Sequence, residues 1–363
     1  MKLSRLKYVA CLLLIFIALL WYRNTIPFLV SPANSSSNNN GIELRGVWLT
    51  NVASGVLFVP GTINRSLKML SQLNFNTVYP VVWNRGTTLY PSEVARQVTG
   101  TGEQPLLKFM QGGTDVLHKI VKLGHGKDLQ VVPWFEYGLM APANSSLAKS
   151  HQEWLTQSRD NDYSIEEEGK QKYHVWLNPL NPEVQQFLQD LVVEVVRNYD
   201  VDGIQFDDHF GLFSKITQSA KAVKPDITIS LATNPYQFAY TEYLQDWLTW
   251  VEEGLVDELI LQVYRDDIGS FSTELSTDTI KKVRGKIPIS IAIFTGNPQH
   301  PVSMEQIEEQ VKTVRDRRFD GLSFFYWESL WSYLTPDSPR KRRQTFQTLF
   351  SQPALVPEFS RFQ

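Results

Sequence analysis

The chain contains very little cysteine, and this scarcity excludes several kinds of chemistry. Its single cysteine, Cys11, lies in an apolar stretch near the N-terminus. An intrachain disulfide, a cysteine metal centre and a thiol nucleophile in the folded part are therefore excluded. Histidine is also scarce, with 6 among 363 residues, and no H-E-x-x-H or comparable spacing indicates a metal. We predict neither a metal ion nor a redox cofactor.

Charge and glycine patterns exclude two further classes of protein. The net charge is only −3, so no strong basic field favours nucleic acid as a partner. No G-x-G-x-x-G follows the first predicted strand, which argues against a dinucleotide-binding open sheet. The chain also has no internal repeat of the solenoid type.

What the chain does contain is a large apolar and aromatic fraction. Hydrophobic residues make up 42% of it, with 10 Trp, 14 Tyr and 20 Phe, which is typical of a globular protein with a sizeable core. Most of these rings are expected in the core, but Trp and Tyr also provide flat faces on which sugar rings stack.

The N-terminus has the pattern of an export signal. Lys2, Arg5 and Lys7 precede an uncharged run over 8–22, which is shorter than the ~20 residues that comfortably span a bilayer. We predict a signal peptide or signal-anchor over 1–30 that contacts the membrane. A polar tether follows over 31–42. The rest is predicted outside the cytoplasm, periplasmic or secreted, or held at the membrane by an uncleaved anchor.

Short β-rich runs alternate with longer amphipathic segments along the remaining chain. Strands are predicted over 44–50, 77–83, 130–135, 203–206, 228–232, 258–263, 287–293 and 321–326. Helices are predicted over 63–73, 114–123, 182–199, 215–223, 239–253, 273–283, 303–315 and 339–350. Eight such units favour a single (β/α)8 TIM-type barrel over 43–350, with a tail over 351–363; a doubly wound sheet is the alternative. Long loops over 84–113 and 137–181, after the second and third strands, are predicted to form cleft walls.

Two adjacent acids end the fourth predicted strand. Asp207 and Asp208 follow an apolar run, and active sites of parallel barrels lie at the carboxyl ends of the strands. One of the two could instead cap the next helix. A hard-cation site using both acids is a weaker alternative.

The other predicted strands end in acids, amides and aromatic residues as well. Glu136 and Glu328 complete the candidate catalytic carboxylates, although Glu136 could instead pair with Arg45 or Arg85 and Glu328 could simply start the last loop. The apolar neighbours of Glu136 favour it as the acid. The candidate substrate-binding residues are Arg45, Trp48, Tyr79, Trp83, Trp134, Trp176, Asn234, Gln262, Tyr264 and Trp327.

Three segments of the chain resemble the glycosyl-hydrolase-like family 10 of bacterial envelope proteins. They are Arg-Gly-Val-Trp-Leu-Thr at 45–50, Trp-Leu-Asn-Pro at 176–179 and Tyr-Asp-Val-Asp-Gly-Ile-Gln-Phe-Asp-Asp at 199–208. Leu-Tyr-Pro-Ser at 89–92 also resembles that family's loop after the second strand. The chain departs from the family pattern at His209, where Tyr is usual, and at Asn178, where an acid is common. The resemblance implies a TIM-type barrel, an extracytoplasmic location and hydrolysis of a glycan. One branch of the family acts on peptidoglycan strands without stem peptides.

We therefore predict a glycoside hydrolase that uses paired carboxylates on a polysaccharide or glycan strand, with no nucleic-acid partner. The alternatives are a non-catalytic glycan-binding barrel, or a hydrolase of another polymer, including a metal-dependent esterase. The oligomeric state and the stereochemistry of cleavage stay open.

Overall fold

A computed structural model describes residues 41–157, 164–165, 174–210, 214–332 and 334–357. The predicted signal or anchor and nearly all of the predicted tether lie outside these residues. Within the described part of the chain, no helix is long and apolar enough to cross a membrane.

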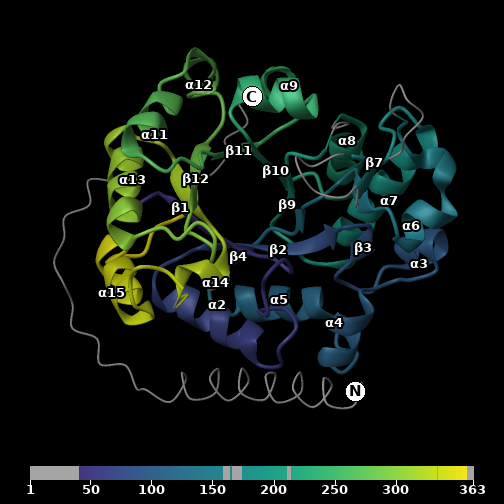
Figure 1. Cartoon of the computed structure of the whole chain (residues 1–363), viewed down its shortest axis with the longest axis horizontal. Coiled ribbons are helices and arrows are strands. Elements are labelled where there is room, and N and C mark those ends of the chain that lie inside the picture. The colour runs from purple at the N-terminus through teal and green to yellow at the C-terminus, as the bar shows by residue number, and fades with distance from the viewer. Residues whose placement is uncertain (1–40, 158–163, 166–173, 211–213, 333, 358–363) are drawn as a thin grey trace. The chain divides into compact units, whose positions relative to one another are not determined.

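Eight parallel strand positions close into a barrel. β1 pairs with both β2 and β13, so the sheet has no free edge at this seam. The third position is divided between two short strands, β4 and β5, with Pro133 between them. The predicted (β/α)8 class is confirmed. The strands, which surround the centre of Figure 1, are β1 (Leu44–Leu49), β2 (Thr77–Asn84), β4 (Gln130–Val131) with β5 (Trp134–Phe135), β9 (Gly203–Phe206), β10 (Thr228–Thr233), β11 (Glu258–Gln262), β12 (Ile289–Phe294) and β13 (Gly321–Phe325).

The helices between these strands begin where the sequence carries capping side chains. Asn181 accepts a hydrogen bond from the Glu183 backbone, with Pro182 in the first turn, and Ser303 caps the next-to-last long helix in the same way. The predicted bounds of these helices agree with the structure to within about two residues. The helices are α2 (Thr62–Gln72), α5 (Val116–His125), α7 (Pro182–Asn198), α8 (Ser214–Val223), α13 (Met304–Asp316) and α15 (Pro339–Leu349).

Two segments predicted as single helices are each divided. The segment 239–253 forms α9 (Tyr236–Tyr243) and α10 (Trp247–Glu252), because Leu244 adopts a left-handed conformation with φ 55°. This break turns the fully buried Gln245 toward the backbone that follows β9, where its amide donates to the carbonyl of Asp207. The segment 273–283 is divided between α11 (Ile268–Glu274) and α12 (Asp278–Val283). α11 begins five residues before the predicted start, because Asp267 caps it there.

The two long loops contain secondary structure of their own. The loop after β2 holds β3 (Thr87–Thr88), α3 (Glu93–Thr99) and α4 (Pro105–Met110). The loop after β5 holds α6 (Ser146–Ser150), a 3-10 helix (Gln152–Trp154) and a three-stranded antiparallel sheet. The strands of that sheet are β6 (Met140–Pro142), β8 (His174–Trp176) and β7 (Ser164–Ile165), in that order. The last barrel strand leads into the short helix α14 (Trp327–Leu330).

The barrel interior carries a row of polar side chains that cross from strand to strand. The Trp48 indole N–H donates to Gln205 at 2.7 Å, and since β1 and β9 are not neighbours in the sheet, this bond crosses the interior. The Gln205 amide donates to Ser230 at 3.0 Å, and Ser230 donates to Glu258 at 2.8 Å. Buried polar groups require such partners, so this row holds side chains in place across the barrel interior.

Candidate active site

Asp207 and Asp208 lie immediately after β9 at the carboxyl end of the barrel. Both are buried, at 6% and 8% exposure. Gln262, at the end of β11, donates to Asp207 at 2.7 Å, and Asn234, after β10, donates to Asp208 at 2.6 Å. His209 Nδ1 is in contact with the second oxygen of Asp208. The acids and amides predicted at three strand ends are therefore brought together.

Glu136 follows β5, the strand beside β9, and is 5% exposed. Its Oε2 accepts a hydrogen bond from the Asn84 amide at 2.6 Å and a longer one from Thr50 at 3.4 Å. Burial raises the pKa of Glu136 to about 8, and the charge of Asp208 adds to the rise, while Arg85 and Thr50 oppose it. A carboxyl group with such a pKa is protonated at neutral pH and can act as a general acid.

Asp207 shares this electrostatic environment. Burial raises its pKa well above the ordinary value, and the negative charges of Asp208 and Glu136 raise it further. Hydrogen bonds from the Asp208 backbone and from Gln262 oppose the rise. Three carboxyl groups so placed do not all ionise together at neutral pH. The site therefore holds at least one protonated carboxyl group at neutral pH.

Glu328 has a different environment. It lies in the first turn of α14, where its Oε1 accepts hydrogen bonds from the Ser54 hydroxyl at 2.6 Å and from the backbone of Gly55 and Val56 at 3.0 Å. Burial raises its pKa, and these bonds oppose the rise. Glu328 thus holds the loop after β1, and the structure records no contact between it and the other three acids. Its Oε2 is buried without a hydrogen-bond partner among the described residues.

Three aromatic rings surround His209, the residue after the two aspartates. Tyr137 and Trp176 come from the long loop after β5, and Tyr243 comes from α9. The imidazole lies 4.9 Å from the Tyr137 ring, 5.6 Å from Trp176 and 4.7 Å from Tyr243, between ring centroids. Trp176 is half-buried. Tyr243 comes from the end of α9 and was not among the predicted site residues, because nothing in a predicted helix distinguishes it.

A second aromatic group lies beneath and beside the acids. The Tyr264 ring stacks on Phe325 with centroids 6.1 Å apart, and Trp134 meets the same ring edge-on at 6.2 Å. Trp134 is only 2% exposed, whereas Tyr264 is half-buried. Trp327, also half-buried, packs against Trp331 at 5.7 Å.

Besides Trp134, four predicted substrate-binding residues lie away from solvent, and we leave all five out of the proposed site. Arg45 is near the amino end of β1, where it pairs with Glu43 at 2.8 Å, so its partner is neither Glu136 nor a ligand at the rim. Trp83 is 1% exposed and donates to the Gly138 carbonyl at 3.2 Å. Trp48 and Tyr79 are equally buried inside the barrel, with their rings 5.0 Å apart.

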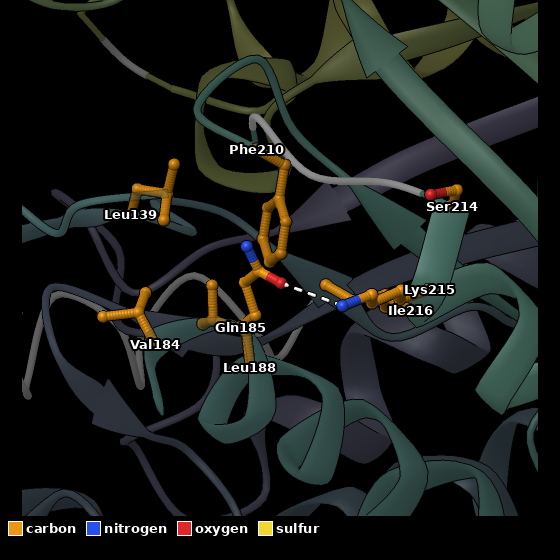
Figure 2. A pocket seen from close by; sticks show the side chains of 8 residues that line it. All are labelled: Leu139, Val184, Gln185, Leu188, Phe210, Ser214, Lys215 and Ile216. Carbon is orange, nitrogen blue, oxygen red and sulfur yellow. Dashed lines mark hydrogen bonds between the residues drawn. The ribbon is translucent and has the colours of Figure 1, made fainter. Parts of the chain in front are cut away.

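A small hollow beside Phe210 has too little volume for a sugar ring. Figure 2 shows it beneath Phe210, between α7 and α8, with Leu139 and Val184 on one side and the Gln185–Lys215 hydrogen bond of 3.4 Å on the other. Its volume is about 60 Å³, against the ~150 Å³ of a cavity that accepts benzene. We interpret it as imperfect packing between α7, α8 and Phe210.

The acids and His209 also form the one group of potential metal ligands found among the described residues. The ligand atoms of Asp207, Asp208 and His209 all lie within 4.8 Å of one another. The two Asp208 oxygens already contact Asn234 and His209, so a cation would have to displace existing contacts.

The chain is similar in sequence and in fold to known glycoside hydrolases. The profile of the family described as Glycosyl hydrolase-like 10 matches residues 43–219 and 211–313, which together span three quarters of the chain. The Glycosyl hydrolase DigH of Escherichia coli (strain K12) is 24% identical over 358 residues, covering 74% of this chain and 76% of that protein.

Two solved structures show the same fold. The PgaB (BpsB) glycoside hydrolase domain from Bordetella bronchiseptica superposes with a TM-score of 0.57 at 10% identity, covering 85% of this chain and 97% of that one. The alpha-galactosidase TtGalA from Thermus thermophilus, in complex with stachyose, gives a TM-score of 0.54 at 11% identity, covering 86% and 65%. At these identities the likeness concerns the barrel alone.

Proposed function

The chain belongs to the Glycosyl hydrolase-like 10 family, and on this premise we propose that it hydrolyses glycosidic bonds with the carboxyl groups at the end of its barrel. The observation that carries the proposal is the convergence of Glu136, Asp207 and Asp208 at one rim, with the pKa of Glu136 raised to about 8. Glycoside hydrolysis needs one carboxyl group that is protonated and one that is ionised.

Glu136 is the proposed proton donor to the leaving-group oxygen. Its burial keeps it protonated at neutral pH, and Asn84 and Thr50 hold one of its oxygens in place. The Asp207–Asp208 pair is the proposed source of the carboxylate that acts as nucleophile or base. Gln262 and Asn234 each donate to one member of this pair, which stabilises negative charge there.

The proposed substrate is an exported polysaccharide, with peptidoglycan glycan strands that lack stem peptides as the first candidate. Support comes from the family and from the N-terminal sequence, which has the pattern of an export signal or anchor. Purified protein should be tested on such strands, on chitin-like glycans and on neutral glucans, with mass spectrometry of the products. Fractionation of cells that express the full chain tests the proposed extracytoplasmic location.

Isosteric amides at the three acids test the mechanism. Glu136→Gln, Asp207→Asn and Asp208→Asn should each lower kcat by ~10²–10⁴ while the protein stays folded. Asp200→Asn is the matched control, because Asp200 precedes the same strand with its side chain 84% exposed. Wild-type turnover in all three active-site variants would refute the mechanism.

Assays with and without a chelator test the alternative of a metal-dependent esterase. The reason for this test is the short spacing of the potential ligand atoms of Asp207, Asp208 and His209. Paired-carboxylate hydrolysis should be unaffected by chelator, whereas a metal-dependent esterase should lose activity and regain it with the metal. Tight retention of oligosaccharide without any product would instead favour a non-catalytic glycan-binding barrel.

A further inference from the structure

A second, larger hollow opens on the same end of the barrel as the acids. Tyr264 and Arg265 after β11, Phe294 at the end of β12, His300 in the next loop and Gln306 in the first turn of α13 line it. Its volume is about 210 Å³, which exceeds the ~150 Å³ that accommodates a benzene ring. It is therefore large enough for one ring of a sugar.

One short stretch of chain, from Gln262 to Tyr264, contacts an active-site acid at its start and lines the hollow at its end. Gln262, which donates to Asp207 at 2.7 Å, stands two residues before Tyr264, so their backbones are at most about 7 Å apart. Burial raises the pKa of the Tyr264 phenol, and the charges of Asp207, Asp208 and Glu136 raise it further, which is consistent with this closeness. A sugar ring in the hollow would therefore lie close to the acids, within reach of a glycan bound there.

The lining matches the surface of a pyranose. Tyr264 and Phe294 are 5.7 Å apart at an interplanar angle of 49°, and both are half-buried, so they form an apolar corner for a sugar face. Gln306, whose amide nitrogen donates to the Arg265 carbonyl at 3.3 Å, presents its amide oxygen, and the exposed imidazole of His300 is a second hydrogen-bonding group for hydroxyls.

The charges on the lining favour an uncharged ring. Arg265 is paired with Glu274 at 2.8 Å, so its positive charge is already compensated. Asp266, an acidic residue that also borders the hollow, is exposed. A ring that carries a carboxylate would meet no unpaired Arg or Lys among the residues that line the hollow.

We propose that this hollow is a saccharide subsite that holds one uncharged hexose-type ring of the glycan beside the bond to be cleaved. The proposal rests on the proposed glycosidase function but names residues, Phe294, His300 and Gln306, that the sequence reasoning did not include. It places the glycan across the rim from the His209 side to the α13 side of the barrel.

Binding measured apart from turnover tests the subsite. Chitohexaose, a neutral N-acetylated oligosaccharide, is titrated calorimetrically into the full chain carrying Asp208→Asn, so that no cleavage disturbs the measurement. Gln306→Trp in this background should fill the hollow and weaken binding about tenfold, the order expected for one lost aromatic contact. Glu309→Trp is the matched control, since Glu309 lies on the exposed face of the same helix, and it should leave affinity unchanged.

A second variant keeps the test valid if Gln306→Trp does not fold. His300→Ala removes an exposed side chain and should weaken chitohexaose binding by about twofold to tenfold, the range for one lost hydrogen bond. Unchanged affinity in every folded hollow variant, or no binding of chitohexaose by the Asp208→Asn protein, would overturn the subsite. Tighter binding of a galacturonic acid hexamer than of chitohexaose would overturn the preference for an uncharged ring. If wild type cleaves no glycan but the binding pattern holds, the subsite stands and the proposed hydrolysis fails.

Discussion

Glu258 should make the stability of this barrel depend on pH, and Glu258→Gln should remove that dependence. The side chain is 8% exposed in the barrel interior and accepts a hydrogen bond from Ser230 at 2.8 Å. Burial raises its pKa from the ordinary value of 4.5 to about 7, with Asp257 adding to the rise and Ser230 opposing it.

The sign follows from which state binds the proton. Between pH 4.5 and about 7 the folded protein keeps Glu258 protonated while the unfolded chain loses the proton, so the folded state becomes less stable as pH rises. A difference of about 2.5 pKa units corresponds to about 3 kcal/mol of unfolding free energy, fully lost above pH 7. Glutamine keeps the shape and the carbonyl that accepts from Ser230 but never ionises.

Urea unfolding of wild type and Glu258→Gln, followed by Trp fluorescence from pH 4.5 to 8, measures the effect. The two proteins should be similar at pH 4.5, and the variant should be more stable by about 3 kcal/mol at pH 8. Subtraction cancels the contributions of Glu136 and Asp207, which both proteins retain. Glu253→Gln, at an exposed position after α10, is the control. A stability difference that does not change with pH would refute the reasoning.

Three further predictions concern activity and packing. The pH–rate profile should fall above about pH 8 as Glu136 loses its proton, and this limb should be absent from residual Glu136→Gln activity; a limb that persists would assign it to another group. Trp83→Ala should lower the free energy of unfolding by ~3–5 kcal/mol, because the ring lies in the core. Trp176→Ala should keep its melting temperature and bind glycan about tenfold more weakly. Thermal melts and glycan titrations that give the reverse pattern would contradict both assignments. Arg342→Met should destabilise by about 3 kcal/mol or more in urea unfolding, since Arg342 is fully buried and donates to three backbone carbonyls; a near-neutral result would mean that those carbonyls find other donors.

The order of strands and helices was readable from the sequence because it depends on local patterns. Apolar runs of four to eight residues, separated by amphipathic segments with caps such as Asn181-Pro182 and Ser303, have few alternatives to a β/α alternation. The eightfold count then favoured a closed barrel. The grouping of Glu136, Asp207 and Asp208 followed from the same topology, because the carboxyl ends of parallel strands meet at one rim.

The direction of a side chain was decided only by tertiary packing. Trp48 and Trp83 stand on strands near the rim, yet both are 1% exposed, because Gln205 and the Gly138 carbonyl offer partners for their indole N–H groups inside the protein. Arg45 pairs with Glu43 at the amino end of β1, which is the end away from the carboxyl rim. No pattern along the chain distinguishes a ring that faces a core from one that faces a ligand.

The breaks in the helices and the electrostatics of the site are also tertiary. Leu244 takes a left-handed conformation, which few non-glycine residues do, where Gln245 turns in to bind the backbone beside Asp207. The same folding removes water from Glu136, and the pKa rise to about 8 comes first from that burial. The sequence by itself determined which acids reach the rim; the tertiary structure decided which of them is stripped of water, because desolvation depends on neighbours from every strand of the barrel.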